Sequence, residues 1–125
     1  MTDTIVLGGT TVRVVAARDE ATLLEVTLLP GEGAGAHTHT LEDETVAVLE
    51  GSLVIEADER IELQPGEAVI LPRGVRHAFA NAGEVTTRAY FFCSPGGLER
   101  FFREVASAGT PDEAAAAARR AGLVF

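Results

Sequence analysis

The sequence predicts an all-β domain of the sandwich or barrel type. Short runs rich in apolar and β-branched residues follow one another at 11–16, 22–29, 45–50, 52–57, 60–63, 68–71, 76–80 and 85–92. Turn-forming pairs such as Pro30-Gly31 and Pro65-Gly66 separate several of these runs. Closely spaced short strands with turn signals between them are typical of all-β domains. At 125 residues with 46% hydrophobic content, the chain is long enough to form one such domain around its own core.

Alternation within the runs indicates which side chains face inward. In the run at 22–29, Leu24, Val26 and Leu28 fall on every second position, so they form one apolar face. The run at 85–92 allows two registers, and we favour the one that turns Arg88 and Tyr90 outward. An unpaired arginine inside an apolar barrel is costly. We therefore expect the intervening residues, 89 and 91, to point inward.

The pattern becomes helical after about residue 96. Leu98, Phe101, Phe102 and Val105 recur at the spacing of an amphipathic helix, which we expect to cover one end or face of the barrel. The segment 110–113, Thr-Pro-Asp-Glu, is a capping box that predicts a second short helix through the alanine run at 114–118. We expect a single domain over residues 1–125, with a barrel at about 10–95 and a helical extension at about 96–125.

The three histidines of the chain predict a metal site. His37 and His39 share one face of an extended strand because alternate side chains point the same way. A turn containing Asp43 can bring Glu44 beside them, and His77 can join from a later strand. Three imidazoles and one carboxylate suit one divalent transition metal ion (Fe, Mn, Co, Ni, Cu or Zn) better than Ca or Mg.

These histidines lie within two patterns that resemble the paired motifs of the cupin family. Residues 31–51 resemble the first motif, residues 66–81 resemble the second, and the likeness extends over about residues 10–95. It implies a double-stranded β-helix, or jelly-roll, barrel with His37, His39, Glu44 and His77 as metal ligands. Ala47 departs from the pattern, since many cupins place an aromatic residue there. The stretch at 96–102 resembles the C-terminal extension of small bacterial cupins described as quercetin-dioxygenase-like.

A substrate pocket follows from the same two-residue period. If Glu44 and His77 point inward, Val46, Val48 and Phe79 point inward too and form an apolar wall beside the metal. Core packing is an equally good interpretation of Phe79. For Asn81, which shares this face, we expect a structural role at a strand end.

Composition narrows the classes of partner. All ten basic residues are arginine, and the net charge of -9 argues against binding to nucleic acid or to an anionic membrane. The absence of lysine excludes Schiff-base catalysis by a lysine side chain. Cys93 is the only cysteine, so we expect a small buried apolar residue there. The N-terminal residues lack a basic region before an apolar run, and no apolar stretch approaches membrane-spanning length, so we expect a cytoplasmic protein with a small-molecule substrate.

Several functions remain open at this point. The resemblance favours a metal-dependent dioxygenase-type oxidoreductase acting on a phenolic or enolisable substrate, with Glu44 as ligand and as general base. A non-redox isomerase, lyase or cyclase and a non-catalytic small-molecule-binding cupin are the alternatives. We also expect a homodimer, in which residues 4–7 pair with a sheet edge of the partner.

Overall fold

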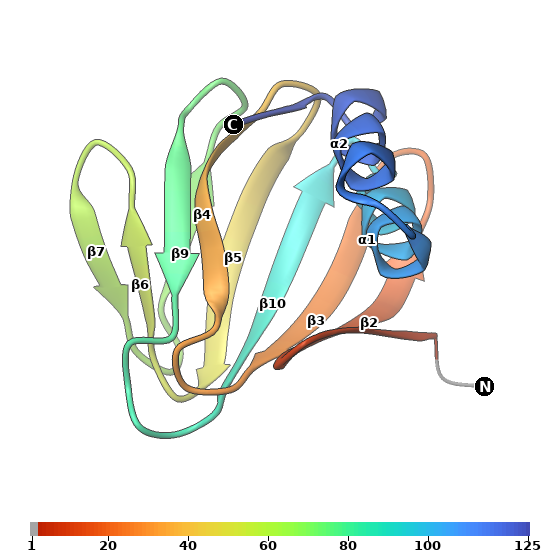
Figure 1. Cartoon of the computed structure of the whole chain (residues 1–125). Coiled ribbons are helices and arrows are strands. Elements are labelled where there is room, and N and C mark those ends of the chain that lie inside the picture. The colour runs from red at the N-terminus through yellow and green to blue at the C-terminus, as the bar shows by residue number, and fades with distance from the viewer. Residues whose placement is uncertain (1–2) are drawn as a thin grey trace.

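Two antiparallel sheets and two helices make up the computed structural model, which describes residues 3–125 (Figure 1). The six-stranded sheet has the order β1 (Thr4–Leu7), β2 (Thr10–Ala17), β3 (Thr22–Leu28), β10 (Thr87–Ser94), β5 (Asp43–Glu50) and β8 (Ala68–Leu71). The five-stranded sheet has the order β11 (Leu123–Val124), β4 (Gly33–His39), β9 (His77–Ala80), β6 (Leu53–Glu56) and β7 (Arg60–Leu63). This arrangement confirms the all-β prediction.

The core contains side chains from both sheets. On β3, burial alternates as predicted, because Leu24 and Leu28 are fully buried whereas Glu25 remains partly exposed. The core also includes Val26 of β3 and residues of the other strands, namely Val12, Val46, Val48, Leu53, Ile55, Leu63, Leu71, Ala89 and Phe91. Apolar and polar side chains alternate along these strands, and the apolar ones point between the two sheets. Their burial therefore stabilises both sheets.

Strand β10 takes the predicted register. Ala89 and Phe91 are buried in the core. The guanidinium of Arg88 lies outside, 2.8 Å from Glu25 and 3.0 Å from Glu50. Because carboxylates on both neighbouring strands pair with this arginine, no basic group is carried into the interior from β10.

Strand β4 begins in the glycine-rich segment 32–36, whose composition is typical of a loop. Gly33 nevertheless pairs with Ala80, and Ala34 pairs with Phe79 on β9. A Cβ atom at Gly33 would lie 2.2 Å from the backbone oxygen of Phe79, so only glycine allows the two strands to approach this closely. Glycine at position 33 is therefore a packing requirement of the strand.

Strand β1 pairs with β2 of its own chain, with Ile5 opposite Val12. It is the last strand on that side of the six-stranded sheet, so its outer edge has no partner strand among residues 3–125. Pairing of this edge with a second molecule remains a prediction. Among the same residues, no helix combines the length and the apolar character needed to cross a bilayer.

The C-terminal segment forms the two predicted helices, α1 (Leu98–Ser107) and α2 (Pro111–Arg120), which lie together beside one end of the large sheet (Figure 1). The hydroxyl of Thr110 accepts a hydrogen bond from the backbone N–H of Glu113 and so caps α2. After α2 the chain turns at Gly122 and adds β11 to the edge of β4. Strand β11 was not among the predicted β-runs.

Candidate metal centre

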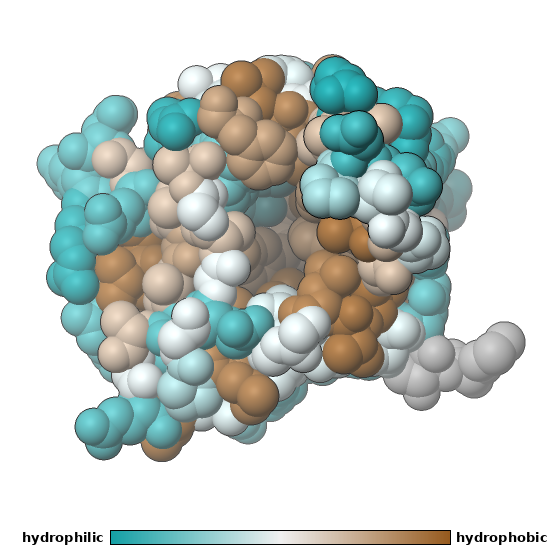
Figure 2. All heavy atoms as spheres, in the orientation of Figure 1, coloured by the Kyte–Doolittle hydropathy of each residue, from teal (hydrophilic) through white to brown (hydrophobic). Residues whose placement is uncertain are grey.

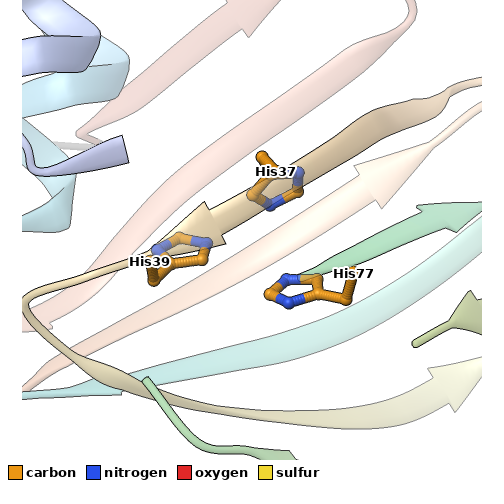
Figure 3. A group of neighbouring side chains, drawn as sticks. All are labelled: His37, His39 and His77. Atoms are coloured by element: carbon orange, nitrogen blue, oxygen red, sulfur yellow. The ribbon is translucent and has the colours of Figure 1, made fainter. Parts of the chain in front are cut away.

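Strands β4 and β9 bring the three histidines together, as predicted. His37 is paired directly with His77 across the two strands, and His39 lies two residues further along β4 on the same face (Figure 3). One ring nitrogen from each histidine lies within 4.8 Å of those of the other two, and all three side chains are buried. This spacing allows the three nitrogens to share one ion.

Each imidazole uses its Nδ1 atom to hold the ring in place. The Nδ1 contacts are His37 to the Gly35 carbonyl at 2.6 Å, His39 to the Glu42 carboxylate at 2.5 Å, and His77 to the Val75 carbonyl at 3.1 Å. Carbonyl and carboxylate oxygens are acceptors, so the proton of each neutral ring belongs on Nδ1. The Nε2 lone pairs remain free, which is the arrangement found when histidines ligate metals.

Glu44 reaches the histidines from β5 in the other sheet. Its Oε1 atom lies 3.3 Å from Nε2 of His77, and its Oε2 atom lies 3.7 Å from Nε2 of His39. Glu44 Oε1 and His77 Nε2 are fully buried and make no hydrogen bond. Buried polar atoms without partners are costly, and a cation between them would satisfy both. The four predicted ligands therefore fit a metal ion.

The charges around the histidines also favour a cation. Burial lowers the pKa of His37. Burial also opposes protonation of His39, but its hydrogen bond with Glu42 and the charge of Glu44 outweigh this effect and raise the pKa. Two carboxylates in a buried site therefore attract positive charge to His39, and a metal ion can supply it in place of a proton.

Cys93 holds the other oxygen of Glu44. Its sulfur is fully buried and lies 3.8 Å from Oε2 of Glu44. Burial, together with the charge of Glu44, raises the pKa of this thiol, so it stays protonated and donates toward the carboxylate. The predicted burial of Cys93 is confirmed, and its contact fixes the orientation of Glu44.

An apolar cavity of about 140 Å³ opens beside the histidines. Its walls are mainly aromatic and aliphatic, and they comprise Thr10, Val12, Val26, Ala34, His37, His39, Glu44, Phe79, Phe91, Leu98, Phe101, Phe102, Leu123 and Phe125. Figure 2 shows the surface hollowed between the strands and the helices, with hydrophobic groups around the hollow. Phe79 lines the cavity, whereas Val46 and Val48 lie in the core and are not among its lining residues. Substrate contact by the two valines stays a prediction.

Two residues of the site, Glu42 and Phe125, were not predicted from the sequence. Glu42 was not singled out, although it belongs to an acidic run, Glu42-Asp43-Glu44, of which only Glu44 was assigned as a ligand. Asp43 instead forms an exposed ion pair with Arg73 at 3.2 Å. The second residue is Phe125, which reaches the cavity through β11. No local pattern marked a strand that short.

Comparisons with known proteins agree with this geometry. Residues 24–93 match the family model described as "Cupin domain". Over 71 residues the chain is 38% identical to the tetracenomycin polyketide synthase protein TcmJ of Streptomyces glaucescens, covering 56% of this chain and 48% of TcmJ. Over 67 residues it is 36% identical to the polyketide synthase CurC of Streptomyces cyaneus, covering 53% of this chain and 44% of CurC. The chain thus spans about half the length of these relatives.

A solved structure supports the fold. An RmlC-like cupin from Shewanella frigidimarina superimposes with a TM-score of 0.72, covering 79% of this chain and 88% of that one. The two sequences are only 18% identical, so this likeness concerns the fold. The predicted double-stranded β-helix barrel is thereby confirmed.

Proposed function

The chain belongs to the cupin family, and on that basis we propose that it is a metal-dependent enzyme acting on a small phenolic or enolisable molecule. One observation carries the proposal. Three clustered imidazoles and an oxygen of Glu44 without a hydrogen-bond partner lie beside an apolar, aromatic cavity, whose walls include His37, His39 and Glu44. Apolar pockets with a few convergent polar groups are the usual form of small-molecule sites.

The ligand set suits one divalent transition metal: Fe, Mn, Co, Ni, Cu or Zn. His37, His39, Glu44 and His77 would hold it. When bound, the metal supplies Lewis-acid or redox chemistry at an oxygen atom of the substrate. The side chains of the cavity would bind and orient the substrate and accept its proton.

The cavity walls position the substrate and exclude water. Phe79 and Phe91 form an edge-to-face pair at 5.1 Å, which makes a rigid apolar floor for a flat ring. Glu44 has the one side-chain carboxylate on the cavity wall among residues 3–125, and its Oε1 atom accepts no hydrogen bond. As a carboxylate of the cavity wall, Glu44 is suited to take a proton from a substrate hydroxyl or from an enolisable carbon, while Cys93 contacts its Oε2 atom. Glu44 would therefore act as a ligand and as the general base.

We favour a non-redox reaction, such as cyclisation or isomerisation, on a polyketide-type substrate. Its support is that TcmJ and CurC carry polyketide synthase names, and such carbon chains contain enolisable carbons next to carbonyl groups. A dioxygenase-type reaction is the second candidate. The nitrogen-rich ligand set supports it, since three imidazoles and a carboxylate suit redox-active iron, nickel or copper.

Oxygen consumption separates the two candidates. The protein is purified without chelator, and conversion of a catechol, a flavonol and a linear β-polyketone is followed under air and under argon. Equal conversion under argon supports the non-redox reaction. Oxygen uptake that matches substrate loss and stops under argon supports the dioxygenase. Binding without product in either gas would leave only a small-molecule-binding role. The control is His77→Ala, which should abolish any metal-dependent conversion.

A further inference from the structure

Strand β11 delivers an aromatic side chain to the mouth of the metal cavity. Leu123 pairs with His39 and Val124 pairs with Thr38, so the next residue, Phe125, falls level with His37. The rings of Phe125 and His37 lie 6.4 Å apart between centroids, and Phe125 lines the cavity. A segment far from the ligands in sequence thus contributes directly to the site.

Contacts of the residues around β11 hold this strand against β4. The backbone N–H and the hydroxyl of Thr40 both donate to the carbonyl of Gly122, at 3.1 and 2.5 Å. Gly122 has a φ of 72°, and a Cβ atom there would lie 2.5 Å from Cγ of Leu41. Leu123 is buried and anchors the strand. A glycine turn, two hydrogen bonds and a buried leucine therefore fix where Phe125 lies.

Stability of the fold does not account for Phe125 itself. Its side chain is 70% exposed, so it removes little apolar surface from water in the unliganded protein. Other lining residues are aromatic too, since Phe79 lies 6.3 Å from His37 and Phe101 lines the cavity from α1. A flat ring bound in this cavity would cover part of the exposed surface of Phe125.

We propose that Phe125 is a specificity-determining residue, which covers the outer face of a single ring held beside the metal ligands and excludes fused ring systems. The inference rests on the proposed function and adds a size limit to its substrate class. The cavity of about 140 Å³ carries the size argument. An engineered apolar cavity of about 150 Å³ in another protein holds one benzene ring. A second fused ring would extend toward the mouth of the cavity, where it would meet Phe125.

The test compares two probes on the Co²⁺-loaded protein by titration calorimetry, catechol with one ring and 2,3-dihydroxynaphthalene with two. The measured quantity is the ratio of the two dissociation constants. Phe125→Ala should weaken catechol binding by roughly threefold to tenfold, the range of one aromatic contact, and should lower the preference for catechol by at least a similar factor. Val124→Ala and Phe92→Ala are matched controls, since both residues are exposed and neither lines the cavity.

Each outcome is decisive. A reduced preference in Phe125→Ala alone, with the cobalt content of all variants equal, supports the inference. An unchanged ratio in that variant, with catechol still bound, overturns the inference and leaves the proposed function standing. If the cobalt-loaded wild type binds neither probe, the proposed phenolic substrate class is wrong, and the size limit falls with it.

Discussion

The Nδ1 atom of His39 lies 2.5 Å from a carboxylate oxygen of Glu42, and both side chains are buried. This contact fixes the ring so that Nε2 faces the centre of the site. Glu42 also adds negative charge next to a ligand, which makes the imidazole a stronger donor to a cation.

Glu42→Gln should therefore weaken metal binding without removing a ligand. Loss of such a partner lowers metal affinity by roughly 10- to 100-fold. Competition titration with a chromophoric chelator measures the effect. Glu56→Gln is the control, because Glu56 is exposed and its ion-pair partner is Arg60 and not a histidine. Wild-type affinity in Glu42→Gln would show that the contact has no role in metal binding.

Replacing Gly122 should detach β11 from β4. Gly122→Ala combines a left-handed backbone with the close approach to Leu41, so we expect a loss of roughly 1–3 kcal/mol in the free energy of unfolding. Urea denaturation provides the measurement. Gly109→Ala is the matched control, since a Cβ atom there would come no closer than 3.8 Å to the flexible side chain of Glu113. Equal stability of both variants would contradict the role given to Gly122.

The ion pairs of Glu25 should make the free energy of unfolding depend on pH. The hydrogen bond from Arg13 lowers its pKa most, partial burial opposes this, and the hydrogen bond from Arg88 lowers it further. A lowered folded pKa means that the stabilisation is complete above the pKa of the unfolded chain and is lost as the pH falls through the folded value.

The stability difference between wild type and Glu25→Gln should therefore shrink steadily from about pH 6 to about pH 2. Urea midpoints at several pH values measure it. Glu20→Gln is the control, because the ion pair of Glu20 with Arg18 is highly exposed and contributes little. A difference that stays constant with pH would be evidence against this ion-pair cluster.

We expect the protein to form a homodimer through the outer edge of β1. Val6 on β1 is 64% exposed, and the edge has no partner strand among residues 3–125. Light scattering should give twice the chain mass of 13.1 kDa. Val6→Lys should shift the protein toward the monomer. A mass of one chain over a wide concentration range would refute the dimer.

The sequence predicted the features that depend on local periodicity. Alternation placed Ala89 and Phe91 inward, and helical spacing placed α1 and α2. The shared face of His37 and His39 followed from strand periodicity, whereas the motif resemblance supported the addition of His77, because spacing along the chain does not show which strands become neighbours. Pairing of His37 with His77 depends on the whole sheet order.

Long-range contacts explain what the sequence did not predict. The glycine-rich start of β4 looks like a loop by composition, and only the close approach of Phe79 shows why Gly33 belongs in a strand. Strand β11 spans Leu123–Val124 and exists because β4 offers it an edge. Such short edge strands have no periodicity of their own, so Phe125 could not be assigned to the cavity in advance.

Metal content together with X-ray absorption tests the central claim most directly. Protein supplied with Zn²⁺ or Co²⁺ at neutral pH should bind one ion per chain, with three nitrogen ligands at about 2.0–2.2 Å and one carboxylate oxygen. His77→Ala should keep its fold by circular dichroism and lose most of the metal, because no other histidine can replace it. A wild-type protein that stays metal-free under these conditions, or a His77→Ala variant that binds metal as tightly as wild type, would contradict the account.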